Sequence, residues 1–171
     1  IRDRRNLSTL SALYAHKNIA FIGKPGTGKT HLAQAFGRAC CEHGMKAYFI
    51  KMTELRDRMT DARRAGREST LLAALVRPSC LIIDEVGHCE FDKENTRLFF
   101  DMVDRRYQKD GYYNMVFTSN RDPAQWQENF CENDSLLCAL DRIFDDAIVF
   151  SIKGESFRGR RLETVSLRSS A

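Results

Sequence analysis

Short apolar runs alternate with segments of helical periodicity along the whole chain. The runs that we predict to be buried strands are 19–22, 46–51, 80–84, 114–118 and 147–152. Between them, apolar residues recur at three- and four-residue spacing, which indicates amphipathic helices around 7–14, 32–43, 52–64, 71–76, 98–107 and 137–144. Strands that alternate with helices and are apolar on both faces predict an α/β fold, with a parallel sheet covered by helices on each side.

Length and composition fit one intracellular domain. The chain has 171 residues, and we divide it into a leading helix (1–17), a core (18–152) and a C-terminal tail (153–171). Six cysteines without a C-x-x-C pair favour free thiols in a reducing compartment. No apolar run is long enough to cross a membrane and the start lacks a signal peptide, so we expect a cytoplasmic protein with no membrane partner.

A glycine-rich turn follows the first predicted strand and fits the pattern G-x-x-x-x-G-K-[ST] at every fixed position. Such a turn aims backbone N–H groups inward, and the helix after it adds the positive end of its dipole, so an anion is favoured. The candidate ATP-binding or ADP-binding residues are Gly23, Lys24, Pro25, Gly26, Thr27, Gly28, Lys29 and Thr30. We expect Lys29 to contact the outer phosphates and the Thr30 hydroxyl to bind Mg²⁺. A turn without a ligand is the alternative.

A pair of carboxylates ends the third predicted strand. The apolar run 81–83 leads into Asp84 and Glu85, at the carboxyl end of the strand, where the glycine-rich turn is also expected. We predict that Asp84 holds Mg²⁺ through the water shell of the ion. Glu85 points to a different side and is the candidate general base toward a water that attacks the γ-phosphate. The alternative is an exposed acidic turn.

Asn120 directly follows the fourth predicted strand and therefore falls at the same edge of the sheet. Its amide suits a hydrogen bond to the attacking water or to the γ-phosphate. Asparagine is also common in turns, so an ordinary turn residue is the alternative. Three of the five predicted strands thus end in candidate ligand residues, and this agreement supports a nucleotide site more strongly than any single motif does.

Basic residues are concentrated in two segments, although the net charge of +4 is too small to indicate a nucleic-acid partner. From Arg56 to Arg67 there are five arginines against two aspartates, and from Arg158 to Arg168 four against one glutamate. On the predicted helix 52–64, Arg56 and Arg63 follow one stripe, which Arg67 extends. The residue types fit a solvated charged face and a surface for phosphate contacts equally well.

Together these motifs resemble the AAA+ ATPases of the IstB/DnaC group, which are helper ATPases of insertion-sequence transposition and loaders of the replicative helicase. The resemblance extends from about Asn18 to Arg158. The segments that carry it are Gly23–Thr30 with His31-Leu32-Ala33, Leu81–Gly87, Arg105-Arg106-Tyr107, Thr118-Ser119-Asn120 with Trp126 shortly after, Asp141-Arg142, and Gly154-Glu155-Ser156-Phe157-Arg158. The last segment and the continuation from Asp84 to Gly87 resemble the IstB members of this group more closely than the DnaC members.

The resemblance implies a P-loop three-layer sandwich whose five-stranded parallel sheet has the order 5-1-4-3-2. It also implies that His31 lies beside the nucleotide, that Asn120 is the sensor 1 residue and that Arg158 is in the sensor 2 position. By the same resemblance, DNA contacts come from the segment after the second strand. The candidates there are Arg56, Arg63, Arg64 and Arg67.

Arg142 is, by the resemblance, an arginine finger that acts on the nucleotide of a neighbouring subunit. A finger in trans requires a head-to-tail interface, which produces a ring or an open helical filament. We therefore expect assembly that ATP and DNA favour. The alternative is an ion pair within the chain, with Asp141, Asp145 or Asp146 as the partner.

Two features depart from many AAA+ proteins. Only about twenty residues follow the fifth predicted strand, so we expect no helical lid domain, as is typical of this group. Ile1 is not an initiating residue, so we expect a fragment or a processed chain that lacks the N-terminal region through which such helpers bind their partner.

The predicted function is that of a Mg²⁺-dependent ATPase that assembles on DNA without sequence preference and recruits or regulates a transposase. The first alternative is a loader of the replicative helicase, which shares the ATPase core. A small-molecule kinase is a more distant alternative, because it would need neither Glu85 beside Asp84 nor an arginine in trans. A GTP-binding switch ranks last, since the sequence contains no N-K-x-D segment.

Overall fold

The computed structural model describes residues 10–131, 140–145 and 147–154, and the structural statements that follow refer to these ranges. Five parallel strands form one sheet in the order β2-β3-β4-β1-β5. They are β1 (Ile19–Gly23), β2 (Ala47–Lys51), β3 (Cys80–Val86), β4 (Asn114–Ser119) and β5 (Ile148–Ile152). Counted from the other edge, this is the implied order 5-1-4-3-2, so the predicted fold class is confirmed.

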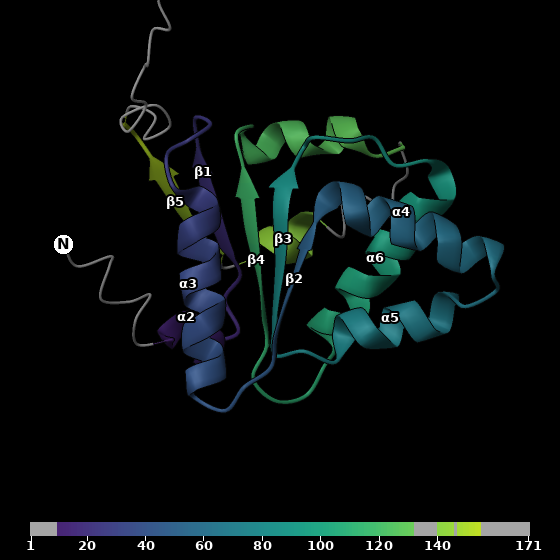
Figure 1. Cartoon of the computed structure of the whole chain (residues 1–171), viewed down its shortest axis with the longest axis horizontal. Helices are drawn as coiled ribbons and strands as arrows, with labels where there is room; N and C mark the ends of the chain where they lie inside the picture. The colour runs from purple at the N-terminus through teal and green to yellow at the C-terminus, as the bar shows by residue number, and fades with distance from the viewer. Residues whose placement is uncertain (1–9, 132–139, 146, 155–171) are drawn as a thin grey trace, which may run out of the picture.

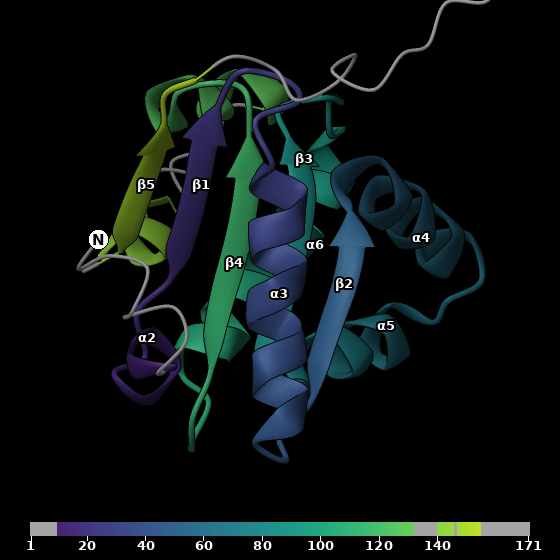
Figure 2. The same ribbon diagram turned by 60° about the vertical axis from the view of Figure 1, so that its left-hand side comes forward.

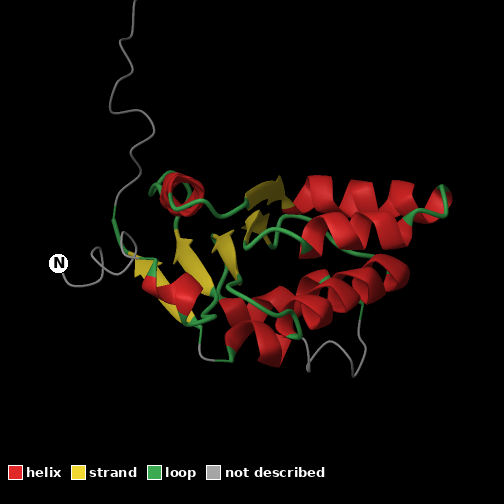
Figure 3. Cartoon of the chain, turned by 90° about the horizontal axis from the view of Figure 1, so that it is seen from below, coloured by secondary structure: helices red, strands yellow, loops and turns green. Residues whose placement is uncertain are grey.

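Helices cover both faces of the sheet (Figures 1 and 2). On one face, α2 (Ser11–Tyr14) and α3 (Lys29–Glu42) contribute to one apolar core. The elements that contribute to the core on the other face are α4 (Met52–Arg64), α5 (Glu68–Val76), α6 (Lys93–Tyr107), the 3-10 helix η1 (Pro123–Asn129) and residues 140–144. Figure 3 shows the sheet between these helices, which confirms the three layers.

Several predicted elements begin earlier than their apolar periodicity indicates. The helix expected from residue 71 begins at Glu68, and the one expected from residue 98 begins at Lys93. The side chain of Asp92 accepts a hydrogen bond from the backbone N–H of Asn95, which caps the added turn of α6. Parts of two predicted helices, at 7–9 and 137–139, lie outside the described residues, as does the chain after 154 on which the absence of a lid depends.

The expectation that every strand is buried on both faces is wrong for β2 and β5. These are the edge strands of the sheet, and residues along both are only partly buried. Phe49 on β2 is 36% exposed and Val149 on β5 is 48% exposed. The apolar runs at 46–51 and 147–152 therefore identified strands correctly, but they could not distinguish an edge strand from a central strand of the sheet.

Arg106, which belongs to the Arg105-Arg106-Tyr107 segment of the resemblance, is fully buried at the end of the sheet opposite the glycine-rich turn. Its guanidinium donates hydrogen bonds of 2.8 to 3.2 Å to the carbonyl oxygens of Leu75, Val76, Pro78, Ser79 and Asn114. Burial lowers the pKa of Arg106 to about 10, so the side chain remains charged at neutral pH. Arg106 therefore joins the end of α5 to the segment before β3 and to the first residue of β4.

Among the described residues, no helix is both long enough and apolar enough to cross a membrane.

Candidate functional site

The glycine-rich turn joins β1 to α3, as predicted. Gly28 has a φ of 89°, in a region that residues with a side chain rarely adopt. At Gly23, a Cβ atom would lie 2.6 Å from the carbonyl oxygen of Ile152, so glycine permits the close approach of β1 and β5. In α3, which the structure describes in full, the first turn has no acidic residue and no capping side chain. Its N–H groups therefore remain available to an anion.

Lys29 lies over this turn. Its Nζ donates hydrogen bonds of 2.8 Å to the carbonyl oxygens of Gly23 and Lys24. The Thr27 hydroxyl donates to the carbonyl oxygen of Lys24 at 2.8 Å, and Thr27 is 5% exposed. Thr27 therefore holds the shape of the turn from within, whereas the Lys29 side chain bridges two of its carbonyl oxygens.

A cavity of about 620 Å³ opens where the strands reach their carboxyl ends, a volume in the range of sites for small molecules. The predicted site residues that line it are Pro25, Gly26, Gly28, Lys29, Thr30, His31, Asp84, Glu85 and Asn120. Six further lining residues were not predicted, and they are Gln34, Phe49, Lys51, His88, Thr118 and Ser119. Gly23, Lys24 and Thr27 belong to the turn but do not line the cavity.

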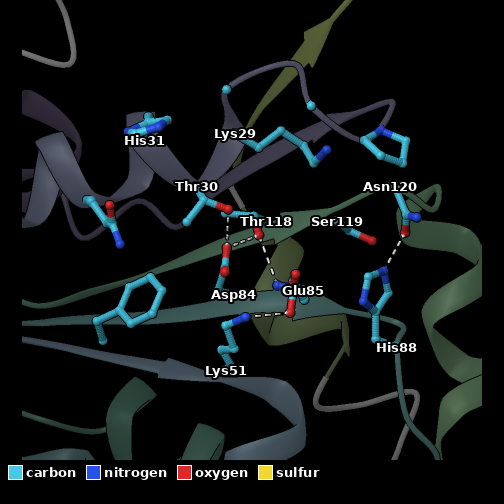
Figure 4. A pocket seen from close by; sticks show the side chains of 15 residues that line it. Lys29, Thr30, His31, Lys51, Asp84, Glu85, His88, Thr118, Ser119 and Asn120 are labelled. Carbon is cyan, nitrogen blue, oxygen red and sulfur yellow. Dashed lines mark hydrogen bonds and ion pairs between the residues drawn. The ribbon is translucent and has the colours of Figure 1, made fainter. Parts of the chain in front are cut away.

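Asp84 is buried beneath the turn, with 1% of its surface exposed. Its Oδ1 accepts hydrogen bonds from the hydroxyls of Thr30, at 2.8 Å, and of Thr118, at 2.6 Å (Figure 4). Both partners are neutral, so neither offsets the charge of the buried carboxylate. Carboxylate and hydroxyl oxygens are the donors that Mg²⁺ prefers, so the residues present fit a bound Mg²⁺.

Glu85 adopts a φ of 61°, which is uncommon for a residue with a side chain and marks local strain. The pairing of β3 with β4 changes register between Ile83 and Val86. At this irregularity, the backbone N–H of Glu85 donates to the Thr118 hydroxyl at 3.0 Å. As a result, both carboxylates of the pair line the cavity, although neighbouring residues of a regular strand point to opposite faces.

Lys51, the last residue of β2, forms an ion pair with Glu85. The distance from Nζ to Oε2 is 3.2 Å, and both side chains are partly exposed. Asn120 lies directly after β4, with its Oδ1 3.2 Å from Nε2 of His88. Figure 4 shows both pairs at the cavity.

Arg142 does not line the cavity of its own chain. Its Nη1 lies 2.6 Å from Oδ1 of Asp104 on α6, and its guanidinium lies 5.8 Å from the centre of the Tyr107 ring. Among the described acidic residues, the ion-pair partner is Asp104, and not Asp141 or Asp145 as the alternative of an ion pair within the chain predicts. Asp146 and Arg158 lie outside the described residues.

The four arginines predicted to contact DNA differ in their surroundings. Arg63 donates to Asp92 and Asn95 at 3.0 and 3.1 Å, so it links α4 to the start of α6. Arg56 pairs with the adjacent Asp57 at 2.8 Å. The side chain of Arg64 is 78% exposed and 4.0 Å from its nearest acid, and Arg67 is exposed. The expected stripe is therefore interrupted at Arg63, because side chains on the neighbouring helix hold it.

The missed lining residues carry different signals in the sequence. Lys51 ends a predicted strand, so the rule that ligands gather at the carboxyl ends of strands would have identified it. The same rule would have identified Thr118, which ends the predicted strand 114–118, and Ser119 directly after it. His88 and Gln34 have no such signal, because a turn and a helix face bring them to the cavity.

The strand order, the glycine-rich turn and the buried aspartate facing it define the P-loop class of nucleotide-binding proteins with the AAA+ order of strands. The family model described as IstB-like ATP binding protein matches residues 2–164. The chain therefore belongs to the IstB-like family of ATP-binding proteins.

Two relatives of this chain are named after insertion sequences. A protein of Geobacillus stearothermophilus, named as an ATP-binding protein of insertion sequence IS5376, is 36% identical over 159 residues, which are 93% of this chain and 62% of the relative. The corresponding protein of IS232 from Bacillus thuringiensis subsp. berliner is 35% identical over 150 residues, covering 88% of this chain and 59% of the relative. This chain thus spans about six tenths of the length of these relatives.

Two solved structures share the fold. The structure of DnaI superposes with a TM-score of 0.73 at 20% identity, covering 92% of this chain and 83% of that one. The structure of the DnaC helicase loader has a TM-score of 0.70 at 20% identity, covering 88% of this chain and 85% of that one. At this identity, the likeness concerns the fold alone.

Proposed function

We propose that this chain is the Mg²⁺-dependent ATPase domain of an insertion-sequence transposition helper. The observation that carries the proposal is the buried Asp84, hydrogen-bonded to Thr30 at the end of the glycine-rich turn and adjacent to Glu85. Asp84, Glu85 and residues of the glycine-rich turn line one cavity, which supports their assignment as metal ligand, base and phosphate site. A phosphate-binding turn without hydrolysis would not require Glu85 there.

Each residue has a defined task in the proposed reaction. Thr30 and Asp84 hold Mg²⁺, which offsets the charge of the β- and γ-phosphates when it is bound. Lys29 donates to the outer phosphates, and the N–H groups of the turn and of α3 surround them. Glu85 takes a proton from the water that attacks the γ-phosphate. The candidate for offsetting the remaining charge is Arg142 of a neighbouring copy.

Transposition is the favoured setting because the relatives compared at 32 to 36% identity are all named after insertion sequences. In this setting, the domain assembles on DNA in its ATP-bound form and recruits or regulates a transposase. The fold shared with the DnaC helicase loader supports loading of a replicative helicase as the second candidate. Pull-downs with each partner in the presence of ATP distinguish the two functions.

Replacing Lys29 by Ala is expected to weaken ATP binding about tenfold to hundredfold, since a charged donor to the phosphates is lost. Isothermal titration with ATP measures this loss. Lys46→Ala is the matched control, because Lys46 is exposed and precedes β2 at the opposite end of the sheet. Equal ATP affinity for Lys29→Ala and the parent chain would contradict the assigned nucleotide site.

DNA binding is expected to depend on Arg56, Arg64 and Arg67, the three predicted arginines that are not held by another helix. If they contact phosphates, replacing all three by Ala lowers the affinity for DNA of every sequence. It also reduces the slope of the logarithm of the binding constant against the logarithm of the salt concentration by about two to three. Fluorescence anisotropy at several salt concentrations, with ATP and with ADP, measures both effects.

A charge-matched control is the triple variant Arg38→Ala, Arg97→Ala and Arg105→Ala, which removes exposed arginines from α3 and α6. This control should keep the salt slope of the parent chain. If both triple variants lower the slope equally, the loss of DNA affinity comes from the change in net charge alone. The arginine-bearing side of α4 is then an ordinary solvated face.

A further inference from the structure

The end of β3 and the turn after it are held by hydrogen bonds from β4 and from the end of η1, beside the cavity. The Ser119 hydroxyl donates to the carbonyl oxygen of Val86 at 2.7 Å. The amide of Asn129, which is 5% exposed, donates to the carbonyl oxygens of Gly87 and Cys89 at 3.3 and 3.2 Å. These bonds hold the backbone on both sides of His88, so little freedom remains to be lost when its side chain forms a contact.

His88 lies in the turn after β3 and faces Asn120, which directly follows β4 (Figure 4). Its Nε2 lies 3.2 Å from the amide oxygen of Asn120. An amide oxygen can only accept hydrogen bonds, so this contact requires the tautomer in which Nε2 carries the hydrogen. The bond therefore occupies the oxygen of Asn120 and leaves its amide N–H groups for a ligand in the cavity.

We propose that His88 is a positioning residue that turns the N–H groups of Asn120 toward the γ-phosphate. This inference rests on the proposed function and narrows it, since Asn120 alone could face either the attacking water or the phosphate. Phosphate oxygens accept hydrogen bonds, so only the amide nitrogen of Asn120 makes a favourable contact with them. Without His88, the amide can rotate and present its oxygen to the anion.

His88 therefore contacts both Glu85, the candidate base, and Asn120, the candidate phosphate donor. The backbone N–H of His88 donates to the carbonyl oxygen of Glu85 at 3.3 Å, while its ring contacts Asn120. One short turn thus sets the position of the candidate base and the orientation of the candidate phosphate donor. The expected ligand group is the terminal phosphate of a nucleoside triphosphate, which a diphosphate lacks.

The ratio of affinities for AMP-PNP and ADP tests this role without requiring turnover. His88→Leu should weaken AMP-PNP binding about threefold to tenfold, the range of one neutral hydrogen bond, and leave ADP binding unchanged. His88→Gln, which has a similar size and retains a donor, should restore most of the loss. His43→Leu, at the exposed end of α3, is the histidine control and should match the parent chain.

Coupling to Asn120 separates positioning from a general structural effect. In an Asn120→Ala chain, His88→Leu should cause no further loss, because the side chain that it orients is already absent. An unchanged affinity ratio in His88→Leu, an equal loss in the Asn120→Ala chain, or a Gln variant as weak as the Leu variant would each overturn the inference. A thermal melt of each variant checks folding, and if His88→Leu does not fold, His88→Ala replaces it.

The failure of the proposed function has a different signature. If the parent chain binds neither AMP-PNP nor ADP in the presence of Mg²⁺, the proposed nucleotide site and the role of His88 are both overturned. If it binds both and the ratio is insensitive to His88, only the positioning role is lost.

Discussion

Glu85→Gln is expected to bind ATP as the parent chain does and to lose hydrolysis by a factor of about 10² to 10⁴, the usual contribution of a general base. Glutamine keeps the size and polarity of the side chain but cannot take a proton from water. Lys29, the glycine-rich turn and Asp84 remain in place, so the phosphates and Mg²⁺ keep their proposed ligands. Titration with ATP and a steady-state assay of phosphate release measure the two quantities separately.

The position of Glu85 makes this prediction specific. Its φ of 61° and the register change between β3 and β4 bring its carboxylate to the cavity beside that of Asp84. The ion pair with Lys51 at 3.2 Å involves partly exposed side chains, so its loss should have little effect on stability. Glu90→Gln, which changes an exposed acid that does not line the cavity, is the matched control. Hydrolysis by Glu85→Gln at the parent rate would mean that another group is the base.

The predicted site residues that lie together at the cavity are those whose position is determined by spacing along the chain. The glycine-rich turn fixes Lys29 and Thr30 relative to the start of α3, and an apolar strand that ends in Asp84 must bring it to the same edge of the sheet. The hydrogen bond of 2.8 Å between Thr30 and Asp84 joins two motifs that are 54 residues apart.

Contacts between side chains of separate elements could not be predicted in this way. The stripe of arginines on α4 was correct as a helix pattern. The side chain of Arg63, however, is hydrogen-bonded to Asp92 and Asn95 at the start of α6. Likewise, the three acids near Arg142 in sequence were natural partners, whereas the fold brings Asp104 of α6 closer. Periodicity specifies the face on which a residue lies and does not specify what packs against that face.

Arg142→Ala is expected to bind ATP almost normally as a monomer and to lose ATP-driven assembly and turnover, by about a thousandfold or more if it acts as other arginine fingers do. Arg142 does not line the cavity of its own chain, so any contact with a γ-phosphate must come from a neighbouring copy. Such a contact requires a head-to-tail interface and therefore a ring or a filament. Sedimentation with ATP and DNA, together with phosphate release, measures the two losses.

Asp104 provides a control that separates the finger from a structural ion pair. Both side chains of the pair with Arg142 are more than one third exposed, so the pair itself should contribute at most about 1 kcal/mol to stability. Asp104→Asn removes the charge of the partner and keeps the arginine, so it should still hydrolyse ATP if Arg142 acts in trans. If Asp104→Asn and Arg142→Ala instead lose activity and thermal stability to the same extent, the pair is structural.

Mixing two inactive variants provides the decisive measurement for Arg142. Lys29→Ala lacks the phosphate contact but keeps the arginine, and Arg142→Ala has the opposite defect. In a mixed assembly, one interface joins an intact nucleotide site to an intact arginine of the neighbouring copy, so part of the activity should return. The recovered rate should pass through a maximum as the ratio of the two variants changes, because only mixed interfaces are active. No recovery at any ratio, together with a lower melting temperature of Arg142→Ala, would contradict the role in trans and favour a structural ion pair with Asp104.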